Sequence, residues 1–218
     1  PSIEGIYVAE WRISNGPCPV SSDQMQIQVF NNSGGGTVTS SATVCSGTNA
    51  GTLSLTGQKG TILRWESSTN NFLPGFITVI PNTLTNLSYS GLTQTTQYRA
   101  IVKAGACPEA ASTFVTISVQ PVGTIASAGA NQILCGSQVQ LTGNAPAVGT
   151  GLWTYVTGPQ TPALISFNPT PPSSNFVTVS NLIPSGTYVF RWTITNGVCG
   201  SSSSDVFITR LNDVPVAN

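Results

Sequence analysis

Apolar and polar residues alternate with a period of two along most of the chain. Residues 139–142, 176–179 and 206–209 show the alternation clearly. This period places apolar side chains on one face of a β-strand and polar side chains on the other, so it predicts half-buried strands. No window has the helical period, and glycine or proline interrupts most stretches. The pattern therefore predicts an all-β protein.

The expected strands are short, and turn residues separate them at close intervals, which is typical of antiparallel β-sandwiches. They fall into two sets. The first set covers residues 52–56, 62–67, 76–79, 87–89, 97–103 and 112–119, and the second covers 137–143, 151–156, 164–167, 175–180, 187–195 and 204–210.

The chain also repeats itself. Residues 5–18 match residues 186–199 at a constant offset of 181, which aligns Tyr7 with Tyr188 and Trp11 with Trp192. A weaker register at half this period aligns Tyr98 with Tyr188. Self-similarity at a fixed period indicates an array of like domains.

The repeat divides the chain into four parts. Residues 1–31 are expected to form the C-terminal hairpin of a truncated sandwich, whose body would precede residue 1. Residues 36–120 and 121–211 are expected to form complete sandwiches, and residues 212–218 a linker or the first strand of a further repeat. The linkers are short and contain proline, so we expect an extended array.

Composition narrows the possible partners. Charged residues make up 6% of the chain and its formal net charge is zero, so no basic surface for nucleic acid is expected. No apolar stretch is long enough to span a bilayer, and the first residues lack the features of a signal peptide. Apolar residues make up 39% of the chain, enough to build a core beneath a surface of hydroxyl and amide groups. A glycan-binding role for that surface stays open.

The five cysteines follow the repeat. Cys45 and Cys107 bracket one expected sandwich, and Cys135 and Cys199 bracket the next. In each, the first cysteine precedes the second strand and the second follows the sixth, so we expect a disulfide within each domain. Cys18 aligns with Cys199 and would pair upstream of residue 1. Reduced thiols and a zinc site are the alternatives. Two bridges would favour an oxidising compartment and would keep the bridged residues from extending under tension.

Several aromatic residues are expected to be structural. Trp65 and Trp153 lie on the expected third strands, where a core tryptophan packs in immunoglobulin domains, and Tyr98 and Tyr188 have the spacing of a tyrosine corner. The full set of expected core and corner aromatics is Trp11, Trp65, Trp153, Trp192, Tyr98 and Tyr188.

Catalytic chemistry is scarce. The chain has no histidine, and its seven acidic residues are scattered, so we expect no catalytic residue, metal site or cofactor. Two alternatives stay open: a side-chain cross-link from Lys59 or Lys103 to an asparagine, and a calcium ion held with the help of Asp213.

Residues 128–135, 149–154 and 190–199 resemble PKD-like repeats of very large surface proteins of Bacteroidota. Residues 44–47, 98–100 and Cys107 are similar to the immunoglobulin-like repeats that alternate with them. The resemblance implies a gliding-motility adhesin that the type IX secretion system exports. The resemblance implies a filament outside the outer membrane on the cell surface.

Two functional hypotheses follow. The first is a non-catalytic, load-bearing segment of a surface adhesin that serves adhesion and gliding. Its partners would be the neighbouring repeats of the same chain, with extracellular polysaccharide or another substratum gripped by other parts of the protein. The second is a linker or carbohydrate-binding module of a secreted polysaccharide-degrading enzyme.

Overall fold

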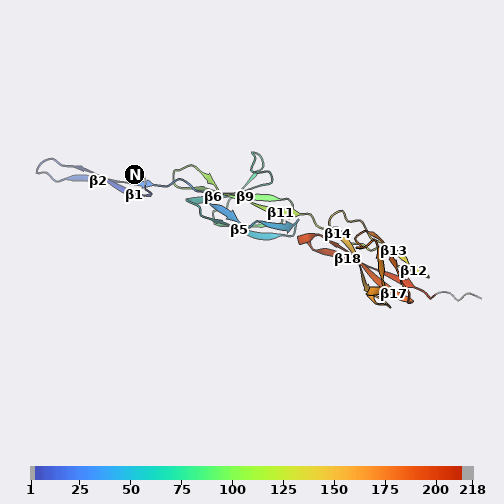
Figure 1. Ribbon diagram of the computed structural model, residues 1–218. Helices are drawn as coiled ribbons and strands as arrows, with labels where there is room; N and C mark the ends of the chain where they lie inside the picture. Colours follow the sequence, from blue (N-terminus) through green and yellow to red (C-terminus); the bar gives the residue numbers. More distant parts are fainter. Residues whose placement is uncertain (1–2, 213–218) are drawn as a thin grey trace, which may run out of the picture. The chain divides into compact units, whose positions relative to one another are not determined.

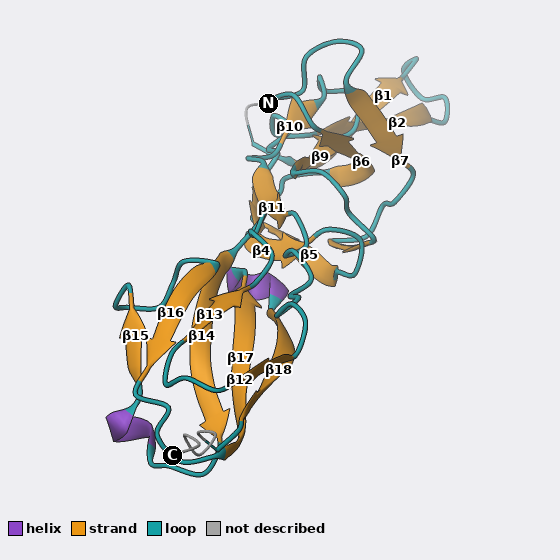
Figure 2. Cartoon of the chain, turned by 90° about the vertical axis from the view of Figure 1, so that its right-hand side faces the viewer, coloured by secondary structure: helices purple, strands orange, loops and turns teal. Residues whose placement is uncertain are grey.

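The computed structural model describes residues 3–212. The chain divides after Val119 into two units, and the described residues of each unit are compact. Asp213 and the rest of the expected linker at 213–218 lie outside the described residues. The predicted all-β class is confirmed. Within the described residues, helix is limited to two three-residue 3-10 turns, Pro162–Leu164 and Gly197–Cys199 (Figure 2).

Unit 1 begins with a β-hairpin (Figure 1). Strand β1 (Gly5–Ile13) pairs antiparallel with β2 (Ser21–Val29), from Gly5 opposite Val29 to Ile13 opposite Ser21. The turn between them places Gly16 at φ +53°, a conformation that favours glycine. The hairpin is a two-stranded sheet of its own.

The rest of unit 1 is a sandwich of two sheets. One sheet has the order β3-β5-β8, and the other has the order β4-β11-β9-β6-β7, with β10 also paired to β9. The strands are β3 (Thr37–Thr39), β4 (Ala42–Cys45), β5 (Ala50–Thr56), β6 (Thr61–Ser68), β7 (Ile77–Ile80), β8 (Asn86–Ser90), β9 (Thr96–Lys103), β10 (Ala110–Ala111) and β11 (Val115–Gln120).

Alternate residues of these strands face each other across the sandwich. Trp65 on β6, Leu53 on β5 and Ile117 on β11 are fully buried in its core. Removing this apolar surface from water supplies most of the drive to fold.

Unit 2 is a second sandwich, whose two sheets can be followed in Figure 2. Their orders are β12-β18-β17-β14 and β13-β16-β15. The strands are β12 (Gln132–Leu134), β13 (Val139–Thr142), β14 (Thr150–Thr157), β15 (Ser166–Asn168), β16 (Phe176–Ser180), β17 (Gly186–Thr195) and β18 (Ser201–Arg210). Strand β12 runs parallel to β18, whereas the other pairs are antiparallel.

Every expected strand overlaps an observed one. Four strands were not expected: β3, β4, β10 and β12 have two to four residues each. Such short segments carry too few alternations to show a period of two.

The two expected disulfides are wrong. Cys107 and Cys135 are free thiols, as is Cys18, whereas Cys45 and Cys199 take part in disulfide bonding. Neither the Cys45–Cys107 pairing nor the Cys135–Cys199 pairing is therefore present.

The direction of the strands explains the error. The second and sixth strands of each sandwich, β5 and β9 in unit 1, run the same way, so the start of one and the end of the other lie at opposite ends of the domain. The Asn49 side-chain amide donates to the carbonyl oxygens of both Cys45 and Leu92, so Cys45 lies near the start of the eight-residue strand β9. Cys107 follows the end of that strand. At about 3.3 Å per residue, roughly 25 Å separates the two ends of β9, far beyond the reach of a disulfide.

Candidate functional site

Three of the four tryptophans lie in the sandwich cores, as expected. In unit 1 the Trp65 indole N–H donates to the Leu84 carbonyl oxygen at 3.0 Å. In unit 2 the rings of Trp153 and Trp192 pack together with their centroids 5.2 Å apart. All three side chains are buried, so none offers a stacking platform for a sugar.

Trp11 departs from the expectation of a core residue. Its side chain is 71% exposed, although its repeat counterpart Trp192 is fully buried. The reason is that β1 and β2 form an isolated two-stranded sheet, which leaves Ile13 and Met25 of the same face exposed as well.

A tyrosine corner is present in unit 2. The Tyr188 phenol donates to the Pro184 carbonyl oxygen at 2.8 Å, and burial raises the pKa of this phenol above its ordinary value. The hairpin repeats the contact, because the Tyr7 phenol donates to the Ile3 carbonyl oxygen at the same distance and sequence separation.

Tyr98 does not form the expected corner. The carbonyl oxygen four residues earlier belongs to Gln94 and already accepts a hydrogen bond from the Thr96 hydroxyl at 2.8 Å. Tyr98 instead lies in the core, with its ring stacked 6.2 Å from that of Tyr89. Burial raises the pKa of its phenol.

The most strongly interacting charged groups of unit 1 lie on β6 and β9. Glu66 is buried and accepts hydrogen bonds from Nε of Arg64 at 2.9 Å and from Nε of Arg99 at 2.8 Å. Arg64 also reaches Glu109 at 3.0 Å. Burial lowers the pKa of Arg64, but its bonds to the two carboxylates outweigh that effect and leave the pKa above its ordinary value. These partners satisfy one another, which is how a structural ion cluster behaves.

The aromatic ring of Phe72 extends this cluster. The Arg99 guanidinium lies 4.1 Å from the ring centroid, a cation–π contact. Asn71 and Phe72 both have positive φ, and Phe72 N–H donates to the Ser68 hydroxyl at 3.0 Å, which fixes the turn. The arrangement stabilises the β6–β7 connection.

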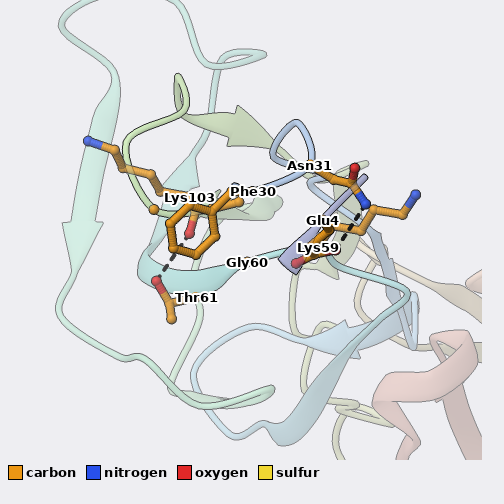
Figure 3. A pocket seen from close by; sticks show the side chains of 9 residues that line it. Glu4, Phe30, Asn31, Lys59, Gly60, Thr61 and Lys103 are labelled. Atoms are coloured by element: carbon orange, nitrogen blue, oxygen red, sulfur yellow. Dashed lines mark hydrogen bonds between the residues drawn. The ribbon is translucent and has the colours of Figure 1, made fainter. Parts of the chain in front are cut away.

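The cavity shown in Figure 3 lies in unit 1, where the segment after the hairpin meets the sandwich. Its volume is about 340 Å³. Phe30 faces it, and the Asn31 amide donates to Glu4 at 2.9 Å. Figure 3 shows the amino groups of Lys59 and Lys103 extending away from the Phe30 ring on opposite sides.

This cavity has the features of a packing site. Gly105 presses against Phe30 so closely that an added Cβ would lie 2.3 Å from the ring. The Ala104 N–H donates to the Ser33 hydroxyl at 2.9 Å, and the Cys107 thiol to the Asn31 carbonyl at 3.5 Å. These contacts fasten the hairpin's connecting segment to the sandwich.

The expected absence of reactive groups remains a prediction. Among residues 3–212, no three acidic or cysteine side chains gather where they could hold a metal ion. The described helices are also too short to cross a membrane.

A family model described as "Domain of unknown function (DUF8696)" matches residues 34–121, which include the whole sandwich of unit 1. No curated protein matches the chain.

Two solved structures are similar to the chain in fold. An I-band fragment of titin has a TM-score of 0.53 and 16% sequence identity, with 95% of this chain and 75% of that chain covered. The extracellular domains 3–5 of Drosophila OTK have a TM-score of 0.50 and 13% identity, with 96% and 72% covered. The described residues are therefore organised as tandem immunoglobulin-like sandwiches.

Proposed function

We propose that this chain is a non-catalytic, load-bearing repeat segment of a long cell-surface adhesin that serves surface adhesion and gliding motility. The observation that carries the proposal is that β1–β2 and β17–β18 share their strand register as well as their sequence. Tyr7 pairs with Ile27 just as Tyr188 pairs with Ile208, at a constant offset of 181. A recurring module is typical of an array.

The proposed domain division follows from the repeat. Residues 1–31 are the last hairpin of a PKD-like domain, residues 36–120 an immunoglobulin-like domain, and residues 121–211 a PKD-like domain. The proposed location is the outside of the cell, after export across the outer membrane. The proposed partners are the neighbouring repeats, while other parts of the protein grip the substratum.

The strand order of unit 2 suits a load-bearing role. Its first strand, β12, is parallel to its last strand, β18, with Gln132 opposite Ile208 and Leu134 opposite Arg210. A force that pulls the two chain ends apart would act on the N-terminal end of β12 and the C-terminal end of β18. Because the strands are parallel, this force shears the paired residues together instead of separating them one at a time.

Further hydrogen bonds join the first segment of unit 2 to β18. The backbone N–H groups of Ala126 and Ala128 donate to the hydroxyls of Ser202 and Ser204 at 3.0 and 3.2 Å. At the C-terminal ends of β12 and β18, the Leu211 N–H donates to the Leu134 carbonyl oxygen at 2.9 Å. Resistance to force is therefore proposed to come from strand pairing, because the predicted bridges within each domain are absent.

Single-molecule pulling on the full chain tests the mechanical part of this proposal. Handles at Asn131 and Leu211 load β12 and β18 in shear, whereas handles at Gly136 and Leu211 load the same strands from one end. We expect a clearly higher rupture force in the first geometry. Equal rupture forces would contradict a load-bearing design.

Two further measurements test the biological part. Antibodies raised against the chain should label intact source cells and should move with the surface machinery during gliding. A glycan array should show no tight binding by this chain. Selective, tight binding to one polysaccharide would instead favour a carbohydrate-binding module of a secreted enzyme.

A further inference from the structure

One face of the hairpin β1–β2 carries large apolar side chains of the kind found in a protein core. Alternate residues of β1 lie on this face, each opposite a residue of β2 on the same face. The pairs are Tyr7–Ile27, Ala9–Met25, Trp11–Asp23 and Ile13–Ser21. Trp11 is 71% exposed and Met25 60% exposed. A two-stranded sheet alone is at best marginally stable in water. We therefore expect another chain segment to pack against this face and bury it.

Strands β17–β18 show which kind of layer covers such a face. Counterparts of the hairpin residues occur there in the same pairs: Tyr188 opposite Ile208, Phe190 opposite Val206, and Trp192 opposite Ser204. Tyr188, Phe190, Trp192 and Ile208 are fully buried. In unit 2 this face packs against the opposite sheet, which contributes Leu141 of β13 and Val179 of β16.

The polar positions of the face match as well. Ser21 and Asp23 occupy the places of Ser202 and Ser204, whose hydroxyls accept the backbone N–H groups of Ala126 and Ala128. A serine hydroxyl and a carboxylate can both accept such bonds. The hairpin therefore retains the two acceptors that an extended first segment of the unit 2 type would need.

We propose that this face is the inner face of an incomplete sandwich, and that it binds a chain segment of the same kind as residues 122–185, which precedes Gly5 in the same polypeptide. That segment supplies an opposite sheet like β13-β16-β15 and a first strand whose N–H groups donate to Ser21 and Asp23. The proposal rests on the proposed assignment of residues 1–31 as the last hairpin of a PKD-like domain, and it does not depend on the adhesive role.

Asp23 argues against a second copy of the hairpin as the covering layer. Asp23 lies directly opposite Trp11, between the Ala9–Met25 and Ile13–Ser21 pairs of the face. Two such faces packed together would bury both carboxylates, each with the Gln24 N–H as its only donor among the described residues, which is costly for a charged group. Backbone N–H groups of a neighbouring strand would satisfy the same carboxylate.

A graft within the full chain tests the proposal. Residues 186–212 are replaced by a copy of residues 5–31, which has the same length, so the hairpin sequence must complete the sandwich of unit 2. We expect cooperative thermal unfolding and a blue-shifted emission from the grafted tryptophan, which would report its burial. Matched changes in the graft locate the effect: Ile27→Thr on the inner face should lower the midpoint by several degrees, and Val8→Thr on the outer face should leave it nearly unchanged.

A second graft controls for the cavity that the smaller hairpin side chain would leave in the core of unit 2. Ala9 stands where unit 2 has Phe190, so the second graft carries Ala9→Phe. Failure of both grafts to fold, or equal effects of the inner and outer changes, would overturn the proposal. In the unmodified chain, a tight dimer that Trp11→Ser converts to monomer would assign the face to a second copy, and would also overturn it.

Discussion

The two sandwiches place their ionic groups differently. In unit 1, Glu66 is buried between two arginines on β6 and β9. In unit 2, the equivalent sheet carries Arg191 and Asp205 as an exposed pair, 2.6 Å apart, and its core is built from the Trp153–Trp192 contact instead. Both domains have an apolar core, to which unit 1 adds a buried ion cluster and unit 2 adds a pair of packed tryptophans. Substitutions should therefore affect the two domains unequally.

The largest expected difference is in the chemical reactivity of the cysteines, each of which should be either labelled or unlabelled by a thiol reagent. In native, non-reduced protein, a maleimide should label Cys18, Cys107 and Cys135, whereas Cys45 and Cys199 should stay unmodified, because they take part in disulfide bonding. Mass spectrometry of the labelled peptides would measure this. Peptides linked as Cys45–Cys107 or Cys135–Cys199 would contradict the strand directions described above.

Glu66→Gln should have the largest effect on stability. The substitution leaves Arg64 and Arg99 without their shared carboxylate, and we expect the free energy of unfolding of unit 1 to fall by about 2–4 kcal/mol. The partial exposure of the arginines keeps the value below that of a fully buried pair. Urea unfolding followed by hydrogen exchange would locate the loss. A change no larger than that of Asp205→Asn would show that burial does not distinguish the two clusters.

Gly151→Ala should destabilise unit 2 by about 1–3 kcal/mol, the usual cost of overpacking. An added Cβ would lie 2.1 Å from the Trp192 ring, so the tryptophan pair would have to move. Gly136→Ala is the matched control, because its Cβ would enter open space. Calorimetry would compare the two variants, and equal melting temperatures would show that the Trp153–Trp192 packing is not tight.

Ser204→Ala should cost about 1 kcal/mol, because it leaves the buried N–H of Ala128 without its acceptor. The control is Ser203→Ala, whose hydroxyl bonds only to the Thr193 hydroxyl on the exposed face. Chemical denaturation measures both. If the two variants have equal stability, the first segment of unit 2 does not depend on this acceptor.

The sequence indicated most of the fold because alternation records which face of a strand is buried. Trp65 and Trp153 were placed correctly in the cores from their position on the expected third strands. The cysteine pairing was wrong, since the pattern predicts where the strands lie but not that the second and sixth strands of a sandwich run in the same direction. The tyrosine corner was correct at Tyr188 and wrong at Tyr98, where one nearby hydroxyl, that of Thr96, takes the carbonyl oxygen. Competition between two hydroxyl groups for one carbonyl oxygen does not alter the alternation of apolar and polar residues, so the sequence pattern could not reveal it.

The smallest expected effect is the pH dependence of the exposed pair in unit 2. Hydrogen bonding to Arg191 lowers the pKa of Asp205 below its ordinary value of 3.8. The carboxylate therefore contributes stability above that ordinary pKa, and the contribution is lost as the pH falls through the lower pKa of the folded state. Asp205→Asn should remove this part of the acid sensitivity while changing stability little at neutral pH, because exposed pairs contribute weakly. Melting temperatures measured from pH 2 to pH 7 would test this, and parallel curves for the variant and the parent protein would show that the pair is not formed in solution.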